Sequence, residues 1–355
     1  HKWLHGTFQL DIEVLTRMRQ GQEQAYAEAA SLIQDDLKDA ITQRRGVQFF
    51  AGKSGKVARL AAAYNAGDNI AVTGLKVDTP LGWSKGDEST ALGFKEDYMK
   101  VVFPIGTRIL IDSVADELLV VTGYKSSGGD ANLDTLLCKT SPGGLLVLGQ
   151  NHADNDWIYY ATSTSLISNA NTNGLVDLFD QTAGTAYMGL KAADAPKWNA
   201  QLVTGSTAGT EEDLDTSHLR RSLITCENEV GEIPDLWIAN THMLGAFEML
   251  AESNTRFNPQ QSALGMEQID YVLPGGRRIK KFLWTRFCPP GMIFGLNTKN
   301  MIHFNLMGGE FDDTNGNMLH RIEGYDVFEG VWRQAENFGT NKRASHVVIK
   351  DLKVV

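Results

Sequence analysis

The sequence of 355 residues predicts an α+β protein, and two observations support this fold class. Residues 22–45 have the apolar periodicity of one long amphipathic helix. Residues 57–160 contain short β-branched runs interrupted by clusters of Gly, Asp, Asn and Ser, a pattern typical of strands and turns. Helices and strands that are segregated along the chain in this way are typical of the α+β class.

The first part of the chain is predicted to be helical. Apolar residues at helical spacing indicate a helix from Phe8 to about Arg19. In the longer helix over residues 22–45, the apolar stripe consists of Ala25, Ala29, Leu32, Ile33, Leu37, Ala40 and Ile41. At 1.5 Å per residue this helix is roughly 35 Å long. Arg44 and Arg45 fall in its last turn, and we expect Gly46 to end it.

The β-rich stretch is predicted to hold its strands in four segments. These segments are residues 68–78, 98–114, 117–127 and 157–166. After them, residues 169–217 are rich in Gly, Ala, Thr and Asn with little periodicity, so we expect long loops there.

The last third of the chain has clearer boundaries. A helix is predicted over residues 215–231, with Asp215 or Thr216 as its N-cap. A short buried strand, Leu236–Ala239, leads into a helix from about Thr241 to Glu252, capped by Asn240 or Thr241. Two strands follow on either side of a Pro-Pro-Gly turn at residues 289–291, and the segment 346–355 forms a last strand.

Composition limits the function classes. Lys plus Arg number 33 against 43 Asp plus Glu, a formal charge of −10, which argues against a protein whose main task is gripping nucleic acid by its phosphates. The cysteines Cys138, Cys226 and Cys288 have no metal-ligand spacing, so we expect reduced, buried thiols. No apolar run approaches the ~18 residues needed to cross a bilayer, and we expect no membrane partner.

A Gly-Lys-Ser triplet at residues 52–54 raises the possibility of a phosphate-binding loop. Such a loop needs four residues between its first Gly and the Gly-Lys-Ser, and it must leave a strand and open a helix. Here five residues separate Gly46 from Gly52, and a helix precedes them. We therefore interpret the triplet as a basic loop after a helix, and keep a nucleotide-dependent enzyme using Lys53 and Ser54 as the weaker alternative.

Other motifs do not reach the pattern that their chemistry needs. The stretch 311–319 resembles a calcium loop, but Phe311 and Ile322 stand where carboxylates are required, so Asx turns explain it better. The eight histidines lack zinc-ligand spacing, and the stretch 205–209 has Thr where a nucleophilic Ser would stand. The seven tryptophans are dispersed, which favours core and interface packing. We predict no catalytic, cofactor-binding or metal-binding residues, no cofactor and no enzyme activity.

The order of the elements resembles the major capsid proteins of tailed bacteriophages, which share the Hong Kong 97-type shell fold. The matching letters are Pro234, Asp235, Trp237, Ile238, Asn240 and Leu244, then Gly275, Gly276, Pro290, Gly291, Met292, Ile293 and Gly295. The segments before residue 22 and after residue 324 also look like the family's lead-in and ending. Two features depart from the family. Few residues precede the long helix, so the family's N-terminal arm and extended loop are reduced or lie upstream, and the stretch 57–160 is an insertion.

The resemblance implies a domain layout. It assigns residues 1–56 to a peripheral domain with a spine helix at 22–45, 57–160 to a β-rich insertion, 161–291 to an axial domain, 292–338 to the peripheral return, and 339–355 to a C-terminal strand of the axial domain.

The resemblance also implies a structural function. The chain would assemble with itself into hexamers and pentamers of an icosahedral head around double-stranded DNA. Its location would be the virion, after assembly in the host cytoplasm. Scaffold, portal and decoration or cement proteins would be partners, with only weak, non-specific contact to the packaged DNA. A nanocompartment shell of the encapsulin type is the alternative within the same fold.

One group of basic residues is a candidate for contacts between subunits. Arg17, Arg19, Arg44, Arg45, Lys53 and Lys56 gather near the ends of the two early helices. We hypothesise that they pair with acids of a neighbouring subunit. A solvated charged face explains the same residues, and both interpretations stay open at this point.

Overall fold

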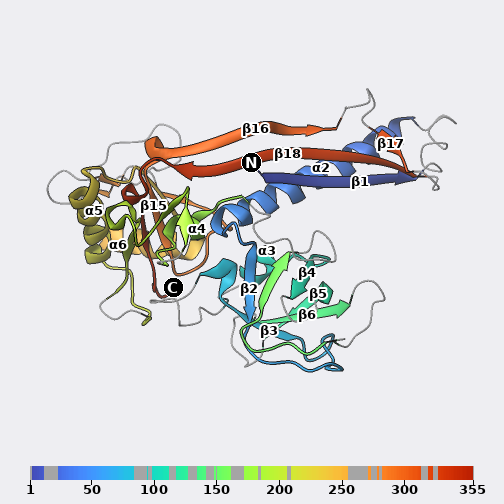
Figure 1. Ribbon diagram of the computed structural model, residues 1–355, viewed down its shortest axis with the longest axis horizontal. Helices are drawn as coiled ribbons and strands as arrows, with labels where there is room; N and C mark the ends of the chain where they lie inside the picture. Colours follow the sequence, from blue (N-terminus) through green and yellow to red (C-terminus); the bar gives the residue numbers. More distant parts are fainter. Residues whose placement is uncertain are drawn as a thin grey trace.

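In the computed structural model, a long helix and a sheet of long strands lie side by side and extend away from the rest of the molecule (Figure 1). The structure describes residues 2–11, 23–83, 94, 98–111, 117–126, 134–140, 148, 150–160, 172–182, 185–205, 209–254, 271–272, 278–279, 282–312, 319–322 and 327–354. We call the extended part the arm: helix α2 (Glu23–Phe50) with strands β1 (Lys2–Asp11), β16 (Met301–Phe311), β17 (Leu319–Arg321) and β18 (Val327–Thr340). The α+β class is confirmed.

Helix α2 confirms the long helix but not its predicted end. The helix continues through Gly46 to Phe50, so Gly46 is not a stop signal. The ring of Phe287 lies against Gly46: a β-carbon there would come within 2.4 Å of the Phe287 ring. Gly46 is therefore a point of close packing. Val47 and Phe50 are buried in the core, and their burial holds the additional turn in helical conformation.

The sheet of the arm is antiparallel around its longest strand. Strand β18 pairs with β1 on one side and with β16 and β17 on the other. The predicted helix from Phe8 is therefore wrong over residues 8–11, which belong to β1, while residues 12–19 lie outside the described residues. Ten residues of β1 pair in unbroken register with β18, and this pairing outweighs the local helical spacing.

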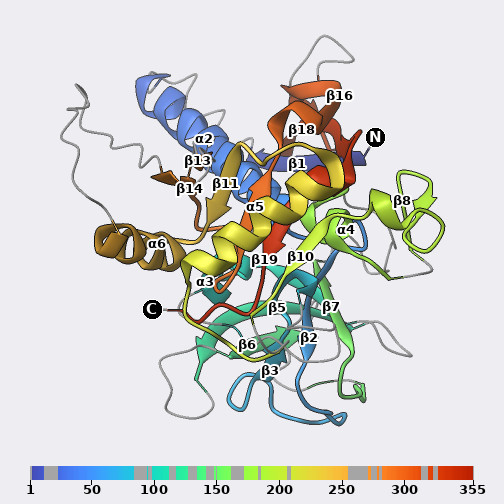
Figure 2. The same ribbon diagram turned by 90° about the vertical axis from the view of Figure 1, so that its left-hand side faces the viewer.

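A five-stranded sheet, the body sheet, forms the centre of the molecule in the order β10-β19-β15-β11-β14. Its strands are β10 (Gln201–Val203), β11 (Leu236–Ala239), β14 (Phe282–Trp284), β15 (Ile293–Leu296) and β19 (Val347–Ile349). Helices α5 (Thr216–Val230) and α6 (Thr241–Asn254) lie beside it (Figure 2). These elements confirm the predicted helices and the predicted strand Leu236–Ala239. The sheet reaches past residue 291 into the predicted peripheral return, since β15 pairs with both β11 and β19.

The predicted β-rich stretch closes into a barrel in the order β2-β3-β6-β5-β4-β7. Its strands are β2 (Lys56–Leu60), β3 (Leu75–Asp78), β4 (Arg108–Ile111), β5 (Glu117–Lys125), β6 (Thr135–Thr140) and β7 (Trp157–Tyr160). Residues 98–102, expected in a strand, form helix α3 (Tyr98–Val102), which ends before Pro104. Its apolar run is too short for periodicity to separate a helix from a strand.

The stretch predicted as long loops contains short elements. Helix α4 (Leu175–Phe179), strands β8 (Ala186–Tyr187) and β9 (Leu190–Lys191) and strand β10 lie within residues 169–217. A further small pair, β12 (Tyr271–Val272) with β13 (Arg278–Ile279), precedes β14. Arg343 fixes the α4 segment because its buried guanidinium donates to the carbonyl oxygens of Leu178 and Asp180.

One hydrophobic core joins the barrel to the rest of the molecule. The rings of Phe50, Trp83, Phe179 and Phe294 meet where α2, the barrel, α4 and the body sheet converge. Their centroids are 5.2 to 6.2 Å apart, the range of favourable aromatic contacts. The barrel is thus packed into the molecule through a shared core. The predicted division into peripheral and axial domains stays a prediction.

Candidate functional site

The Gly-Lys-Ser triplet forms the loop between α2 and β2. The chain passes from helix to loop to strand, the reverse of the order in a phosphate-binding loop. The backbone N–H of Lys53 donates to Oδ2 of Asp177 over 2.6 Å, and the N–H of Gly174 donates to the same oxygen over 3.0 Å. A carboxylate of the chain therefore occupies the position that a phosphate would take. The Lys53 ammonium donates to the carbonyl oxygen of Ala186.

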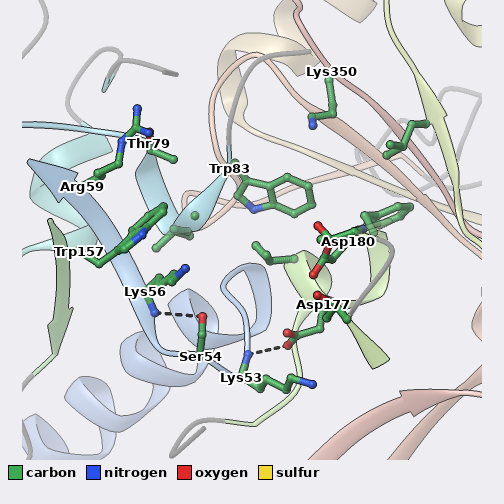
Figure 3. A pocket seen from close by; sticks show the side chains of 17 residues that line it. Lys53, Ser54, Lys56, Arg59, Thr79, Trp83, Trp157, Asp177, Asp180 and Lys350 are labelled. Carbon is green, nitrogen blue, oxygen red and sulfur yellow. Dashed lines mark hydrogen bonds between the residues drawn. The ribbon is translucent and has the colours of Figure 1, made fainter. Parts of the chain in front are cut away.

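A cavity of about 470 Å³ opens beside this loop, between the barrel, α4 and the body sheet (Figure 3). Its charged lining residues are Lys53, Lys56, Arg59 and Lys350 with Asp177 and Asp180. The Lys56 ammonium lies 4.3 Å from the centre of the Trp157 ring, an attractive cation–π contact. Arg59 is paired with Asp78 at 3.0 Å.

Asp177 is the buried carboxylate of this cavity. Burial raises its pKa to about 6, while the N–H groups of Gly174 and Lys53 and the charge of Lys53 oppose that rise. The two N–H donors fix the carboxylate between the loop and α4. The Asp177 carboxylate thus connects the end of α2 to α4, which is a structural role. The arrangement does not position a group for attack on a phosphate. Sequence reasoning missed Asp177 because the residue lies in the stretch expected to be loop.

The residues of the predicted basic group have different contacts in the structure. Arg45 is paired within the chain: its Nε and Nη2 donate to the two carboxylate oxygens of Glu336, each over 2.7 Å. Arg44 lies with its guanidinium carbon 3.5 Å from the centre of the Tyr160 ring. Arg45 is thus engaged within its own chain, and the pairing of this basic group with a neighbouring subunit stays a prediction. Arg17 and Arg19 lie outside the described residues.

The cysteine prediction is confirmed. Cys138, Cys226 and Cys288 are free and buried, and burial raises the pKa of Cys138 and of Cys226 to about 12.

Within the described ranges, no three His, Cys, Asp or Glu side chains are grouped so that they could hold a metal ion. The centres of the stretches 311–319 and 205–209 lie outside these ranges. The helices in the described part of the chain include none with the length and hydropathy of a membrane span.

Large apolar side chains are exposed at the rims of both sheets. On β16, Phe304 is 37% exposed and Leu306 is 62% exposed. On β14, an edge strand of the body sheet, Leu283 and Trp284 are exposed as well. The outer edges of β16, β1, β10 and β14 have no pairing strand among the described elements. Exposed apolar residues on strand edges are the features through which chains associate.

Comparison with known proteins gives distant structural likenesses. Neither a family model nor a curated protein sequence matches the chain. The cyanophage A-1(L) capsid asymmetric unit is 13% identical with a TM-score of 0.38, over 52% of this chain and 61% of that chain. The procapsid of satellite phage P4, which includes the size determination protein, is 9% identical with a TM-score of 0.36, over 100% of this chain and 71% of that chain.

An encapsulin is also similar, at a lower TM-score. The holo-SrpI encapsulin complex from Synechococcus elongatus is 14% identical with a TM-score of 0.30, over 44% of this chain and 54% of that chain. The match therefore spans less than two thirds of the cyanophage and encapsulin chains. Phage capsid proteins are thus among the structures that this chain resembles, as its sequence indicates, and so is an encapsulin.

Proposed function

We propose that the chain is a structural subunit that assembles with copies of itself into a closed protein shell. The observation that supports this most strongly is strand β16 in the arm. Successive side chains of a strand point to opposite faces of its sheet, and residues 303–306 of β16 are all exposed. Both faces of this strand are therefore in water, and its outer edge has no pairing strand in the described part of the chain.

An exposed strand of this length is a liability for a protein that functions alone. Phe304 and Leu306 place apolar surface in water, and the unpaired edge offers backbone donors and acceptors to another chain. Contact with neighbouring subunits would bury both. The function of a shell protein comes from the contacts between its subunits, so the protein needs no catalytic reaction.

Within this proposal, the major capsid protein of a tailed phage is the specific function that we favour. Its copies would form hexamers and pentamers of an icosahedral head around double-stranded DNA, in a virion assembled in the host cytoplasm. A formal charge of −10 suits an inner wall that must release its DNA, because each neutralised phosphate adds affinity. Scaffold, portal and decoration proteins would be further partners. The chain would need no cofactor and catalyse no reaction.

Electron microscopy of the purified full chain tests the shell function. We expect hollow particles from the wild type, with co-purified DNA for a phage head and an enclosed enzyme for a nanocompartment. The variant Leu306→Lys should form far fewer particles, because it places a charge on an apolar contact, whereas the matched variant Leu306→Met should assemble normally. A wild-type chain that stays monomeric at every concentration contradicts the proposal.

A further inference from the structure

A second cavity, of about 290 Å³, lies between α2 and the barrel, which Figure 1 shows below that helix. Helix α2 forms one wall, α3 and the turn at residues 104–107 form another, and strand β7 adds Tyr160. Most of the lining side chains are apolar: Ala40, Val47, Val101, Val102, Pro104 and Ile105. The volume is near the lower end of the range of roughly 300–1,000 Å³ that small-molecule sites occupy, so the cavity can hold a small group.

Arg44 brings one positive charge into these apolar surroundings. Its guanidinium carbon lies 3.5 Å from the centre of the Tyr160 ring, an attractive cation–π contact. The hydroxyl of Tyr160 donates to the carbonyl oxygen of Val102, which fixes the ring. Among the residues that the structure describes, Arg44 has no hydrogen-bond or ion-pair partner, and none of those that line the cavity is a carboxylate. The cation is thus held in place but is not neutralised.

The charge of Arg44 is costly in this position. Burial lowers the pKa of Arg44 to about 10, so the surroundings disfavour the charged form. A guanidinium carries five N–H donors and no acceptor, and contact with an aromatic face satisfies none of them by a normal hydrogen bond. An anion with two acceptor oxygens matches the fork of donors and compensates the charge.

Thr107 adds a hydroxyl to the same cavity. The turn that carries it is closed by a 3.0 Å hydrogen bond from the N–H of Thr107 to the carbonyl oxygen of Pro104. Gly106, with a φ of 89°, stands where a type II turn needs a positive φ. The backbone of Thr107 is thus used by the fold, whereas its Oγ1 has no hydrogen-bond partner in the described part of the chain. A threonine hydroxyl is a second donor for a carboxylate oxygen.

The mouth of the cavity is open to water. Ala40 on α2 is exposed, and Ile105 on the turn is 67% exposed. Gly106 lies at the rim, and a β-carbon added there would meet no atom within 4 Å. Val47, further along α2, is buried and belongs to the inner wall. A small group can therefore enter between Ala40 and Ile105, although no helix could lie along this side of α2.

We propose that this cavity binds a carboxylate joined to a short apolar group. The carboxylate accepts from the guanidinium of Arg44 and the hydroxyl of Thr107. The apolar group packs against Val101, Pro104 and Ile105. Two sources carry this chemistry: a free small carboxylic acid, and an acidic side chain between apolar residues of a peptide. The site needs a single copy of the chain, so it goes beyond the shell function and does not depend on it.

Ligand-observed NMR with the purified full chain tests the site. The probes are hexanoate, as the free acid, and the peptide acetyl-Leu-Glu-Leu-amide, as the protein-borne carboxylate. Their matched uncharged probes are hexanol and acetyl-Leu-Gln-Leu-amide. We expect at least one of the two carboxylates to bind with saturation, at least about tenfold more tightly than its uncharged match, because hydrogen bonds to charged groups are the stronger ones.

Variants of the polar groups show where the carboxylate binds. Arg44→Met removes the charge, keeps an unbranched side chain and should weaken binding by at least about tenfold. Thr107→Val removes the hydroxyl and should weaken it by about threefold. The matched control is Arg108→Met, which removes an exposed cation beside Thr107 that is not part of the cavity lining and should bind like the wild type.

A variant at the mouth gives a test that is independent of charge. Position 40 is exposed on α2, so Ala40→Trp should fold normally, and its ring should block entry to the cavity. Circular dichroism verifies the fold of each variant. If Arg44→Met fails to fold, Ala40→Trp and Thr107→Val decide the question.

The outcomes separate this site from the shell function. Binding of hexanoate supports a free acid as the ligand, and binding of the Glu peptide alone supports a protein-borne carboxylate. Absence of saturable binding of both up to about 10 mM overturns the site. Equal affinity for the uncharged probes, or unchanged affinity in folded Arg44→Met, overturns it as well. An equal loss in Arg108→Met also overturns it, because general charge attraction then explains the binding. Each of these results holds whether or not the wild type forms particles.

Discussion

Glu336 is the residue that ties α2 to the sheet of the arm. Its carboxylate accepts two hydrogen bonds from Arg45, one from Gln334 over 2.9 Å and contacts Nε2 of His303 over 2.8 Å. The Glu336 side chain is only 4% exposed. A buried charge with several donors is stable only while those donors remain.

Removal of Arg45 should therefore weaken the fold. We expect Arg45→Met to lower the free energy of unfolding by about 2 kcal/mol, less than for a fully buried pair because the Arg45 side chain is 39% exposed. Lys38→Met is the matched control. It breaks an exposed pair with Asp35 and should cost at most about 0.5 kcal/mol. Urea denaturation of dissociated subunits measures both, and equal losses for the two variants would disprove the role of Glu336.

His346 is a buried neutral histidine. Its Nδ1 accepts from the backbone N–H of Asn297 over 3.1 Å, so the proton is on Nε2, which donates to Oγ1 of Thr340 over 2.9 Å. The Thr340 hydroxyl in turn donates to the carbonyl oxygen of Asn300. Burial lowers the pKa of His346 from 6.5 to about 4. A second proton on Nδ1 of His346 would make this atom a donor that faces the N–H donor of Asn297, so their hydrogen bond would be lost.

The contribution of His346 to the stability of the fold should therefore fall on acidification. Because the folded-state pKa is lower than 6.5, the unfolded chain takes up the proton first, and the contribution of His346 is lost between pH 6.5 and about 4. The total loss is about 3 kcal/mol. Asp177 acts with the opposite sign, since its raised pKa removes stability as the pH rises from 3.8 to about 6.

A comparison of wild type with His346→Gln isolates the histidine from Asp177. The difference in free energy of unfolding between the two proteins should shrink by about 3 kcal/mol from pH 7 to pH 4. A difference that stays constant over this range would mean that His346 does not titrate as its surroundings predict.

At the scale of elements, Gly46 places α2 against the turn that precedes β15. Alanine favours a helix by about 1 kcal/mol relative to glycine. If position 46 were exposed, replacing Gly46 by alanine would therefore stabilise the protein. The Phe287 ring leaves no room for a β-carbon. We expect Gly46→Ala to lower the free energy of unfolding by about 1–3 kcal/mol, as for other overpacked sites.

A second substitution, Phe287→Ala, shows whether the Phe287 ring causes the loss of stability in Gly46→Ala. In a Phe287→Ala background the same Gly46→Ala change should become neutral or stabilising, because the clash is gone. Thermal unfolding of the four proteins completes the cycle. If Gly46→Ala destabilises both backgrounds equally, the close approach to Phe287 is not the reason for the glycine.

The elements that could be predicted from the sequence are those with local signals. Helix α5 begins where Asp215 accepts from the N–H of Ser217, and it ends at Gly231, whose φ of 74° is left-handed. Strand β11 and the start of α6 follow in the same way from a short apolar run and an N-cap, since Asn240 accepts from the N–H of His242.

The elements that could not be predicted depend on residues far along the chain. Strand β1 forms because β18 pairs with it, and α2 continues past Gly46 because Val47 and Phe50 reach the common core. At the candidate site, the sequence indicated that the Gly-Lys-Ser loop is not a phosphate site. It gave no sign of Asp177, Glu336 or Tyr160, since partners across the chain leave no local pattern.

At the scale of the whole molecule, the arm and the core have opposite characters. The barrel, α4 and part of the body sheet share one hydrophobic core, and the rest of the body sheet packs with α5 and α6 in a second core. The arm extends away from the rest of the molecule, and residues 303–306 of its outer strand β16 are exposed on both faces of the sheet.

Sedimentation velocity of the purified full chain, over a range of concentrations, tests most directly whether these surfaces exist to join copies of the chain. The proposed shell predicts a fast boundary of megadalton particles whose share grows with concentration, with Leu306→Lys shifting material back to slow species. A single boundary of monomer size at every concentration would contradict it.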